Sequence, residues 1–514
     1  MKALSLIIVS SLSLISLQMS AQTRDKALTK SVLEQLQAGS KLPDKSLVEK
    51  LRNCDILNTV TDSSVLASAD TSCTYRVHWS GVTDQKNSGR CWIFSTFNIL
   101  RAEVIDKYDL DGFEFSQTYI QFWDLMEKSN HFLENVIRYR HQPIDNRMNA
   151  WLFNKPFGDG GHFMNAAHII DKYGVVPQEI MPERYSSTDN KKLMNLVRKV
   201  LRGYSMDIRR APRSKVAGLK LAALTDVYTI LCETLGTPPT EFDYSFKAHS
   251  AASHTVDPQT AAVAGPISFM ASVDSKVATR STPSWHYTPL TFRDAFIKHN
   301  LESDYVVLMN DPNLKYYRTY RVDESRNCYE YADWTFLNLP MSDLEKLGIA
   351  SLKGGSMFYF SADTDKDGQD AAGVYDLRLL PIDSRLGVHS QMSKADMMAS
   401  AQSTSLHAIA MCGVKTEKSE PSTSSAAVSS HGTTGPTVTL NSSATDISEE
   451  KPVHWLAENS YGPGRGWNGT IVLSADWFDT YLFRMAIERK YVPAHLQALA
   501  SKRPHKLPAW HLGY

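Results

Sequence analysis

The sequence predicts an α+β fold with two or more subdomains, on three observations. A chain of 514 residues is longer than one simple hydrophobic core usually accommodates. Apolar residues recur at helical spacing over residues 91–104, and further helices are predicted at 191–202 and 216–235. From about residue 303 the chain becomes rich in short runs of β-branched and aromatic residues, such as 305–309. Helices are therefore expected mainly in the first part of the chain and strands mainly in the second.

A cysteine at the predicted start of a helix is the strongest functional signal in the chain. Gly89 permits a tight turn just before Cys91, and Gln85 stands six positions before this cysteine. A thiol at a helix N-terminus faces unpaired N–H groups and the positive end of the helix dipole, which predicts a lowered pKa and a nucleophilic thiolate. The Gln85 amide and the Cys91 backbone N–H are suited to hold the oxyanion of a tetrahedral intermediate. The alternative is a cysteine buried on a core helix.

Two downstream residues are candidates to complete this site. His407 lies in the apolar run 406–411, which predicts a strand, and Asn459 ends a second predicted strand just before a Gly-rich turn. An asparagine carbonyl that accepts the imidazole N–H holds the ring in one tautomer without adding charge. A lone histidine on an apolar strand is usually a packing residue, but the chain order Cys, His, Asn is that of papain-like proteases. His454 is the competing histidine, and we interpret it as a surface or packing residue.

The chain resembles the bleomycin hydrolase and aminopeptidase C family, a branch of the papain-like cysteine peptidases. The resemblance runs from about residue 65 to the C-terminus. Besides the motifs above it includes residues 115–119, 122–124, 158–161, 172–177, 181–183, 235–239, 310–312, 476–478, 489–493 and 507–510. It implies a papain-like, two-lobed cysteine peptidase fold. By position, Cys91 is the nucleophile, His407 the base and acid, Asn459 the orienting residue and Gln85 the oxyanion donor.

The same resemblance implies how substrate binds. Gly160 and Gly161 resemble the backbone edge along which the family lays an extended substrate. In the family the C-terminal tail enters the cleft, and its terminal carboxylate, here on Tyr514, pairs with the substrate α-ammonium. Only four residues follow Trp510, which is shorter than the usual tail. These features predict an aminopeptidase, with a papain-like endopeptidase that has an opened cleft as the alternative.

Composition and resemblance together predict the division of the chain. The expected parts are a signal peptide at 1–21, a helical arm at 22–64, a helical lobe with the nucleophile at 65–185, an inserted helical hook subdomain at 186–300, and a β-rich lobe with His407 and Asn459 at 301–514. Flexible loops are expected at 245–285 and at 415–450, where 16 of 36 residues are Ser or Thr. In the family, contacts through the hook form a homohexamer. The loop at 245–285 lies in this hook and departs from the family pattern.

The N-terminus predicts export, and the net charge gives no reason to expect nucleic acid or an anionic membrane as a partner. Met1-Lys2, an apolar run over 3–17 and a small residue at Ala21 predict a signal peptide cleaved after Ala21, and hence a secreted or periplasmic protein. The run is too short for a good membrane span, and a retained anchor is the alternative. The formal net charge of +0 gives no field that would gather nucleic acid or an anionic membrane. Peptides are the expected partners.

No metal or organic cofactor is expected. The six cysteines lack metal-ligand spacing and are too few for a disulfide framework. Residues 363–368 imitate the first half of a calcium loop, but Val374 stands where a bidentate Glu is required, which predicts a solvated acidic turn. Two other function classes compete. The complete set of four catalytic residue types opposes a silent papain fold used for binding or assembly, and Asn459 opposes a Cys-His acyltransferase, which usually uses Asp.

Overall fold

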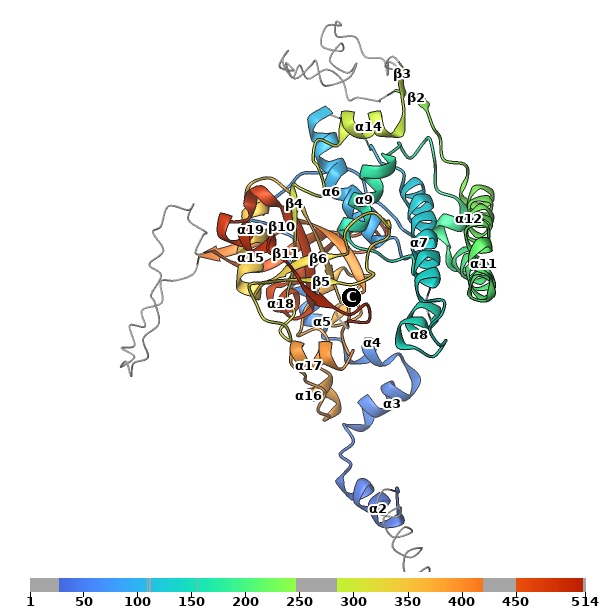
Figure 1. Cartoon of the computed structure of the whole chain (residues 1–514). Coiled ribbons are helices and arrows are strands. Elements are labelled where there is room, and N and C mark those ends of the chain that lie inside the picture. The colour runs from blue at the N-terminus through green and yellow to red at the C-terminus, as the bar shows by residue number, and fades with distance from the viewer. Residues whose placement is uncertain are drawn as a thin grey trace, which may run out of the picture. The chain divides into compact units, whose positions relative to one another are not determined.

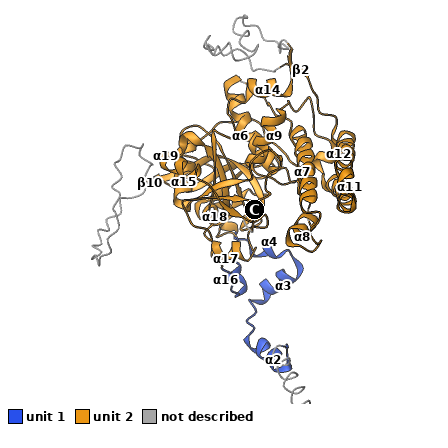
Figure 2. Ribbon diagram, viewed as in Figure 1, with its two compact units in different colours: residues 1–62, 380–391 blue, residues 63–379, 392–514 orange. Residues whose placement is uncertain are grey.

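The computed structural model describes residues 27–108, 110, 112–154, 156–245, 284–418 and 450–511. The predicted signal peptide, most of the two predicted flexible loops and Tyr514 lie outside the described residues. The chain divides into two compact units, residues 1–62 with 380–391 and residues 63–379 with 392–514 (Figure 2). Among the described residues, no helix is long and apolar enough to cross a membrane.

The first unit consists of short capped helices. They are α2 (Lys30–Gly39), α3 (Lys45–Asn53), α4 (Ile56–Val60) and α16 (Ile382–Leu386). The side chains of Thr29, Asp44 and Asp55 accept hydrogen bonds from the third backbone N–H that follows each of them, as helix N-caps do. Gly387 ends α16 in the left-handed conformation at φ 67°, where glycine carries no steric penalty.

The second unit begins with a helical layer. Its helices are α5 (Ser63–Ala67), α6 (Cys91–Tyr108), α7 (Gln117–Tyr139), α8 (Arg147–Asn154), α9 (Phe163–Tyr173), α10 (Tyr185–Thr188), α11 (Lys191–Arg210), α12 (Arg213–Leu235) and α14 (Pro289–Phe296). α11 and α12 lie side by side and pack on α7 (Figure 1). Every residue of α6 from Cys91 to Ala102 is buried, because this part of the helix packs against α7, α9 and the sheet. The helix predicted to start at Cys91 is confirmed.

The sheet provides the other half of the core. Its strands follow the order β14-β5-β6-β4-β13-β7-β10-β11-β12-β9-β8, and β1 pairs with β10. Their bounds are β1 (Tyr75–Arg76), β4 (Tyr305–Met309), β5 (Arg318–Val322), β6 (Thr335–Asn338), β7 (Phe358–Ala362), β8 (Gly368–Gln369), β9 (Val374–Tyr375), β10 (His407–Lys418), β11 (Glu450–Glu458), β12 (Thr470–Ser474), β13 (Leu482–Glu488) and β14 (His505–Leu507). The second unit also holds α15 (Met341–Lys353), α17 (Lys394–Ala399), α18 (Ala475–Tyr481), α19 (Ala494–Ala500), the 3₁₀ turn η2 (Arg489–Tyr491) and a separate hairpin of β2 (Phe242–Tyr244) and β3 (Trp285–Tyr287).

The pairing of β10 with β11 is the part of the sheet that matters most for the site. The two strands are antiparallel, so the start of β10 lies beside the end of β11. β7 pairs with the other edge of β10, with His407 opposite Ala362. α6 packs across β10 and β7, which brings the helix that begins at Cys91 against these two strands. The mixed helix and sheet architecture agrees with the predicted α+β class.

Two expectations about surface segments are corrected. The loop predicted at 415–450 starts too early, because Lys415–Lys418 extend β10 and pair with β11, and backbone pairing outweighs the polar composition there. The acidic turn predicted at 363–368 is not freely solvated. Asp363 is buried and accepts hydrogen bonds from the backbone N–H groups of Asp365 and Thr404, and Tyr481 donates to Asp367. These carboxylates accept hydrogen bonds that hold neighbouring segments of the fold together. All six cysteines are free thiols.

Candidate active site

The loop before α6 is fixed by a buried arginine. The Arg90 guanidinium makes two parallel hydrogen bonds of 2.8 Å to the carboxylate of Glu183, and its Nε donates to Ser88 Oγ at 3.0 Å. Arg90 is fully buried, so this planar fork is shielded from solvent and holds the loop in one geometry. The carbonyl of Arg90 accepts the N–H of Ile93 and begins the helix. Cys91 is therefore held at the first position of α6.

Asp159 connects this loop to the glycine-rich segment 158–161. Its carboxylate accepts the Gly89 N–H at 2.7 Å, and its carbonyl accepts the indole N–H of Trp92 at 2.8 Å. A Cβ at Gly89 would lie 2.5 Å from the Asp159 carboxylate, and a Cβ at Gly161 would lie 2.8 Å from the Trp92 ring. Both positions therefore require glycine for close approach.

The Gln85 side chain is held at both ends of its amide. Its Oε1 accepts the Ser460 hydroxyl at 2.7 Å, and its Nε2 donates to the carbonyl of Ser88 at 2.5 Å. The backbone N–H of Gln85 also donates to the Ser460 carbonyl. An amide nitrogen carries two hydrogens, so one donor is used within the loop and the second is left for an oxyanion. The residue predicted as oxyanion donor thus lies in the loop that leads to Cys91.

His407 and Asn459 meet as the sequence predicted. His407 Nε2 lies 2.7 Å from Asn459 Oδ1, an arrangement in which the imidazole N–H donates to the amide oxygen. The same oxygen accepts the Ser460 N–H at 2.8 Å, and this fixes the amide orientation. The Tyr461 ring stacks on the imidazole, with centroids 4.7 Å apart. Burial lowers the pKa of His407, although the Asn459 hydrogen bond acts in the opposite direction, so the neutral imidazole is favoured.

The electrostatics of the thiol correct one prediction. Burial raises the pKa of the Cys91 thiol to about 11, and the backbone N–H groups of Ala408 and Trp92 offset only part of this effect. The predicted lowering counted the helix N-terminus but not the loss of solvent around a residue that is 8% exposed. The bond from Ala408, which follows His407 in β10, shows that the sulfur lies against the start of that strand. Thiol and neutral imidazole are the resting forms that this geometry favours.

The predicted substrate edge is held by a lysine. Lys128 Nζ donates to the carbonyl of Gly160 at 2.8 Å and to that of Gly158 at 3.2 Å, and it also pairs with buried Asp124 at 2.6 Å. Open space surrounds the Cα of Gly160, where an added Cβ would meet no atom within 4 Å. The role of Gly160 and Gly161 in binding substrate stays a prediction.

The sequence missed several supporting residues. In the sequence, Glu183 and Asp159 stand only within family-like segments, and Ser460 carries no signal of its own. Their partners stand 93, 70 and 375 positions away along the chain, a separation that leaves no local signal. We interpret His454 from the sequence as a surface or packing residue, and the structure shows packing: its ring is buried and makes a 2.8 Å hydrogen bond with the Ser72 carbonyl.

Comparison with known proteins identifies the family. The model of the Peptidase C1-like family matches residues 27–285, 281–433 and 423–512. The chain belongs to this family. It is 29% identical to bleomycin hydrolase of Gallus gallus over 441 residues, which cover 84% of each chain. It is 27% identical to aminopeptidase C of Listeria innocua over 491 residues, which cover 94% of this chain and 98% of the relative.

A solved structure supports the same assignment. The crystal structure of PepW from Lactobacillus rhamnosis matches with a TM-score of 0.79 at 28% identity, and the match covers 95% of this chain and 98% of that one. The protein is therefore a cysteine-type peptidase of the papain-like fold, as the sequence predicted. The comparisons do not test the individual catalytic roles, which stay predictions supported by the geometry above.

We expect Gln85→Ala to lower kcat by about 100-fold, with a much smaller change in KM. The substitution removes the amide donor that we assign to the oxyanion, a charge that exists only in the transition state. Steady-state kinetics on a short peptide measures both constants. Ser460→Ala, which removes only the hydroxyl that holds the amide oxygen, is the matched comparison and should cost much less. An equal loss in both variants would show that Gln85 acts through loop structure.

We expect kcat/KM to fall with decreasing pH only below pH 6.5. The neutral imidazole of His407 accepts the thiol proton, and burial lowers its pKa below the ordinary 6.5, so this base remains competent until the pH falls through that lowered value. The charge of Asp370 acts to raise the His407 pKa, so Asp370→Asn should move the acid limb to still lower pH. A pH profile of kcat/KM on an uncharged peptide checks this, and an acid limb above pH 6.5 would contradict it.

Proposed function

We propose that this peptidase is an aminopeptidase that removes residues from the N-terminus of peptides. The observation that carries the proposal is the alignment with aminopeptidase C over 98% of that relative. In this chain the Cys91 thiol lies against the start of β10, where His407 is hydrogen-bonded to Asn459. Aminopeptidase W of Lactobacillus delbrueckii is a further relative, 28% identical over 463 residues. Peptides are the proposed substrates.

The proposed chemistry follows from the resting forms of the two catalytic groups. Neutral His407 takes the proton of the Cys91 thiol as the sulfur attacks the scissile carbonyl. Gln85 Nε2 and the Cys91 backbone N–H stabilise the oxyanion of the tetrahedral intermediate. The imidazolium then gives its proton to the departing amine. In the second half-reaction His407 accepts a proton from water, which hydrolyses the thioester and frees the thiol.

The C-terminal segment is proposed to set the exopeptidase specificity. β14 pairs with β5, and the centroid of the Trp510 ring lies 4.2 Å from the guanidinium of Arg147. These contacts fix the chain as far as Trp510. We propose that the Tyr514 carboxylate pairs with the substrate α-ammonium. That residue lies outside the described part of the chain. The second candidate function is an endopeptidase with an opened cleft.

Product analysis tests the specificity directly. Mass spectrometry should show stepwise loss of N-terminal residues from a free-amine peptide and little cleavage of the same peptide after N-acetylation. Deletion of Gly513 and Tyr514 should reduce this preference for the free amine. Cys91→Ser provides the inactive control. Faster cleavage of the acetylated peptide by the intact enzyme would refute the aminopeptidase and support the endopeptidase.

We also propose that the mature chain is exported. The support is the predicted signal peptide at residues 1–21, and the proposed product begins at Gln22. N-terminal sequencing of the protein from the medium or the periplasm tests this, and a chain that retains Met1 inside the cell would overturn it. The homohexamer implied by the family resemblance stays a prediction, which light scattering of the purified protein would check.

A further inference from the structure

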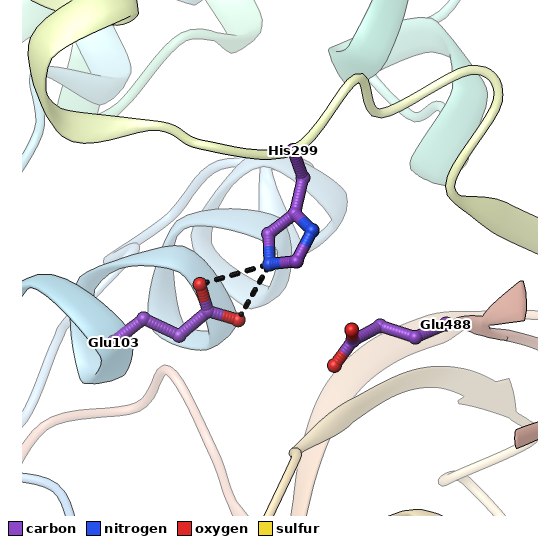
Figure 3. Close-up of side chains that lie close together, drawn as sticks. All are labelled: Glu103, His299 and Glu488. Carbon is purple, nitrogen blue, oxygen red and sulfur yellow. Dashed lines mark hydrogen bonds and ion pairs between the residues drawn. The ribbon is translucent and has the colours of Figure 1, made fainter. Parts of the chain in front are cut away.

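Three potential metal ligands converge on the side of α6 away from its N-terminus. Glu103 lies on α6, His299 follows α14, and Glu488 is the last residue of β13 (Figure 3). One donor atom from each side chain lies within 4.8 Å of the other two. His299 Nε2 is 3.2 and 3.0 Å from the two carboxylate oxygens of Glu103, and Figure 3 shows the carboxylate of Glu488 turned toward the same ring.

We propose that Glu103, His299 and Glu488 bind one divalent transition-metal ion of the Zn²⁺ type. One imidazole nitrogen with two carboxylates is a donor set suited to Zn²⁺ and its neighbours, and bonds of about 2.0–2.2 Å place such donors roughly 3–4 Å apart. The observed separations need only a small closure of flexible glutamate side chains. Because Glu103 is exposed and His299 half-buried, solvent can supply the fourth ligand.

A buried tyrosine provides independent support. The Tyr305 residue is 2% exposed, and its hydroxyl has no hydrogen-bond partner among the described residues. Its ring lies edge-on to the His299 ring, with centroids 5.9 Å apart, and Tyr305 stands opposite Glu488 in the pairing of β4 with β13. A buried hydroxyl without a partner costs about 1–3 kcal/mol. A water or hydroxide bound to the metal would give this O–H an acceptor.

A third carboxylate lies behind the histidine, at ion-pair rather than hydrogen-bond distance. His299 Nδ1 lies 3.9 Å from Asp304 Oδ2, on the opposite side of the ring from Glu103. A carboxylate behind a histidine ligand is the usual outer partner of a metal-bound imidazole. The same Asp304 oxygen accepts the Asn300 N–H at 2.9 Å, which fixes the segment that carries His299. The ligand and its outer partner therefore belong to one short, closed turn.

The neighbouring charges show which metal-free state would compete with metal binding. Three carboxylates surround the ring. Among the described residues, Lys490 forms an ion pair of 2.7 Å with Glu488 through a side chain that is 57% exposed, and the charge of Lys298 interacts with Glu103. In the metal-free alternative, a protonated His299 would form an ion pair with the Glu103 carboxylate, which lies 3.0 Å from its Nε2. A metal must displace that proton, so its affinity should fall as the pH decreases. The alternative is an ion pair of imidazolium and carboxylates that binds no metal.

The position of the site indicates a structural role. Its ligands come from α6, from the segment after α14 and from β13 of the sheet. An ion held there would link the helical layer to the sheet at a distance of twelve residues along α6 from Cys91. It would stabilise the packing of α6 without taking part in the chemistry at the thiol, so this inference does not depend on the proposed aminopeptidase activity.

Zn²⁺ titration of the full chain tests the proposal. The Cys91→Ser background removes the reactive thiol, which itself binds Zn²⁺. Calorimetry should show one tight ion per chain, with affinity reduced at least about tenfold in His299→Gln and in Glu488→Gln. Zn²⁺ should also raise the Tm of the Cys91→Ser protein and leave that of the His299→Gln protein unchanged. With Co²⁺ as probe, the spectrum should lack the intense thiolate charge-transfer band.

A second histidine offers a matched control. His286 pairs with Asp243 at 3.0 Å and with Glu241 at 3.4 Å, but through opposite ring nitrogens on an exposed surface. His286→Gln should therefore leave Zn²⁺ affinity unchanged. Equal affinity in the parent, His299→Gln and Glu488→Gln would overturn the proposal. So would a lower Tm in His299→Gln without any response of the parent to Zn²⁺, which is the result expected for an ion pair alone.

Discussion

Cys91→Ser should abolish peptide-bond hydrolysis, with a loss in kcat of at least about 10⁴-fold, while the fold is retained. A serine hydroxyl is a much weaker acid than a thiol, and His407 is oriented by the neutral Asn459 rather than by a carboxylate that would stabilise the imidazolium. The site therefore cannot deprotonate an alcohol as a serine protease does. Peptide hydrolysis followed by mass spectrometry measures the loss, and a thermal melt checks the fold.

Two further variants make this prediction specific. Cys54 is exposed and outside the site, so Cys54→Ser should retain full activity. A thiol-directed peptidase inhibitor should label the parent and the Cys54→Ser protein at Cys91, and should fail to inactivate any residual activity of Cys91→Ser. Undiminished turnover in Cys91→Ser would exclude the thiol mechanism and remove the basis of the proposed function.

The sequence was sufficient to single out the candidate catalytic residues, whose roles stay predictions, because their positions depend on local signals. Cys91 opens a helix after a glycine, and His407 and Asn459 each stand at the end of an apolar strand. The 52 positions between them do not matter, because the start of β10 lies beside the end of β11 in any antiparallel pair. A long connection costs little, since the entropy of closing a loop grows slowly with its length. Strand ends alone thus bring the two side chains together.

Other features could not be predicted because they depend on long-range packing. The bidentate pair of Arg90 with Glu183 and the contact of Asp159 with Gly89 link segments 70 or more positions apart. The sheet order, with parallel pairs such as β4 with β6 among antiparallel ones, leaves no periodic trace in the chain. The raised pKa of Cys91 has the same origin, because a helix start can be read from the sequence but the degree of burial around it cannot.

A buried ion pair next to Asn459 in the chain illustrates this dependence on long-range packing. Arg101 on α6 and Glu458, which directly precedes Asn459, are 1% and 2% exposed and form a short ion pair. Arg101 also donates to the Gly81 carbonyl at 3.2 Å, but its Nε and Nη1 have no partner among the described residues, and neither does Glu458 Oε2. Burial raises the pKa of Glu458 to about 7 despite the nearby guanidinium. The carboxyl can therefore become neutral, whereas the guanidinium cannot.

This asymmetry predicts unequal costs for two matched substitutions. Glu458→Met leaves a buried cation without its anion and should cost about 3–5 kcal/mol of unfolding free energy. Arg101→Met leaves a carboxyl that takes up a proton, so it should cost only about 1–3 kcal/mol at pH 7. The double variant should be closer to the parent than Glu458→Met, because neither charge of the Arg101–Glu458 pair remains buried. Urea unfolding at pH 7 measures all three.

The pH dependence of Arg101→Met checks the mechanism. Without the cation, the folded-state pKa of Glu458 rises further above its ordinary 4.5, so its contribution to stability is fully present below pH 4.5 and is lost as the pH rises through the folded-state value. The deficit of Arg101→Met relative to the parent should therefore be larger at pH 8 than at pH 5. An equal deficit at both values, or a Glu458→Met protein as stable as Arg101→Met, would show that the guanidinium is compensated elsewhere. A fall in kcat of Glu458→Met should accompany its loss of stability, because the strand end that carries Asn459 would no longer be held against α6.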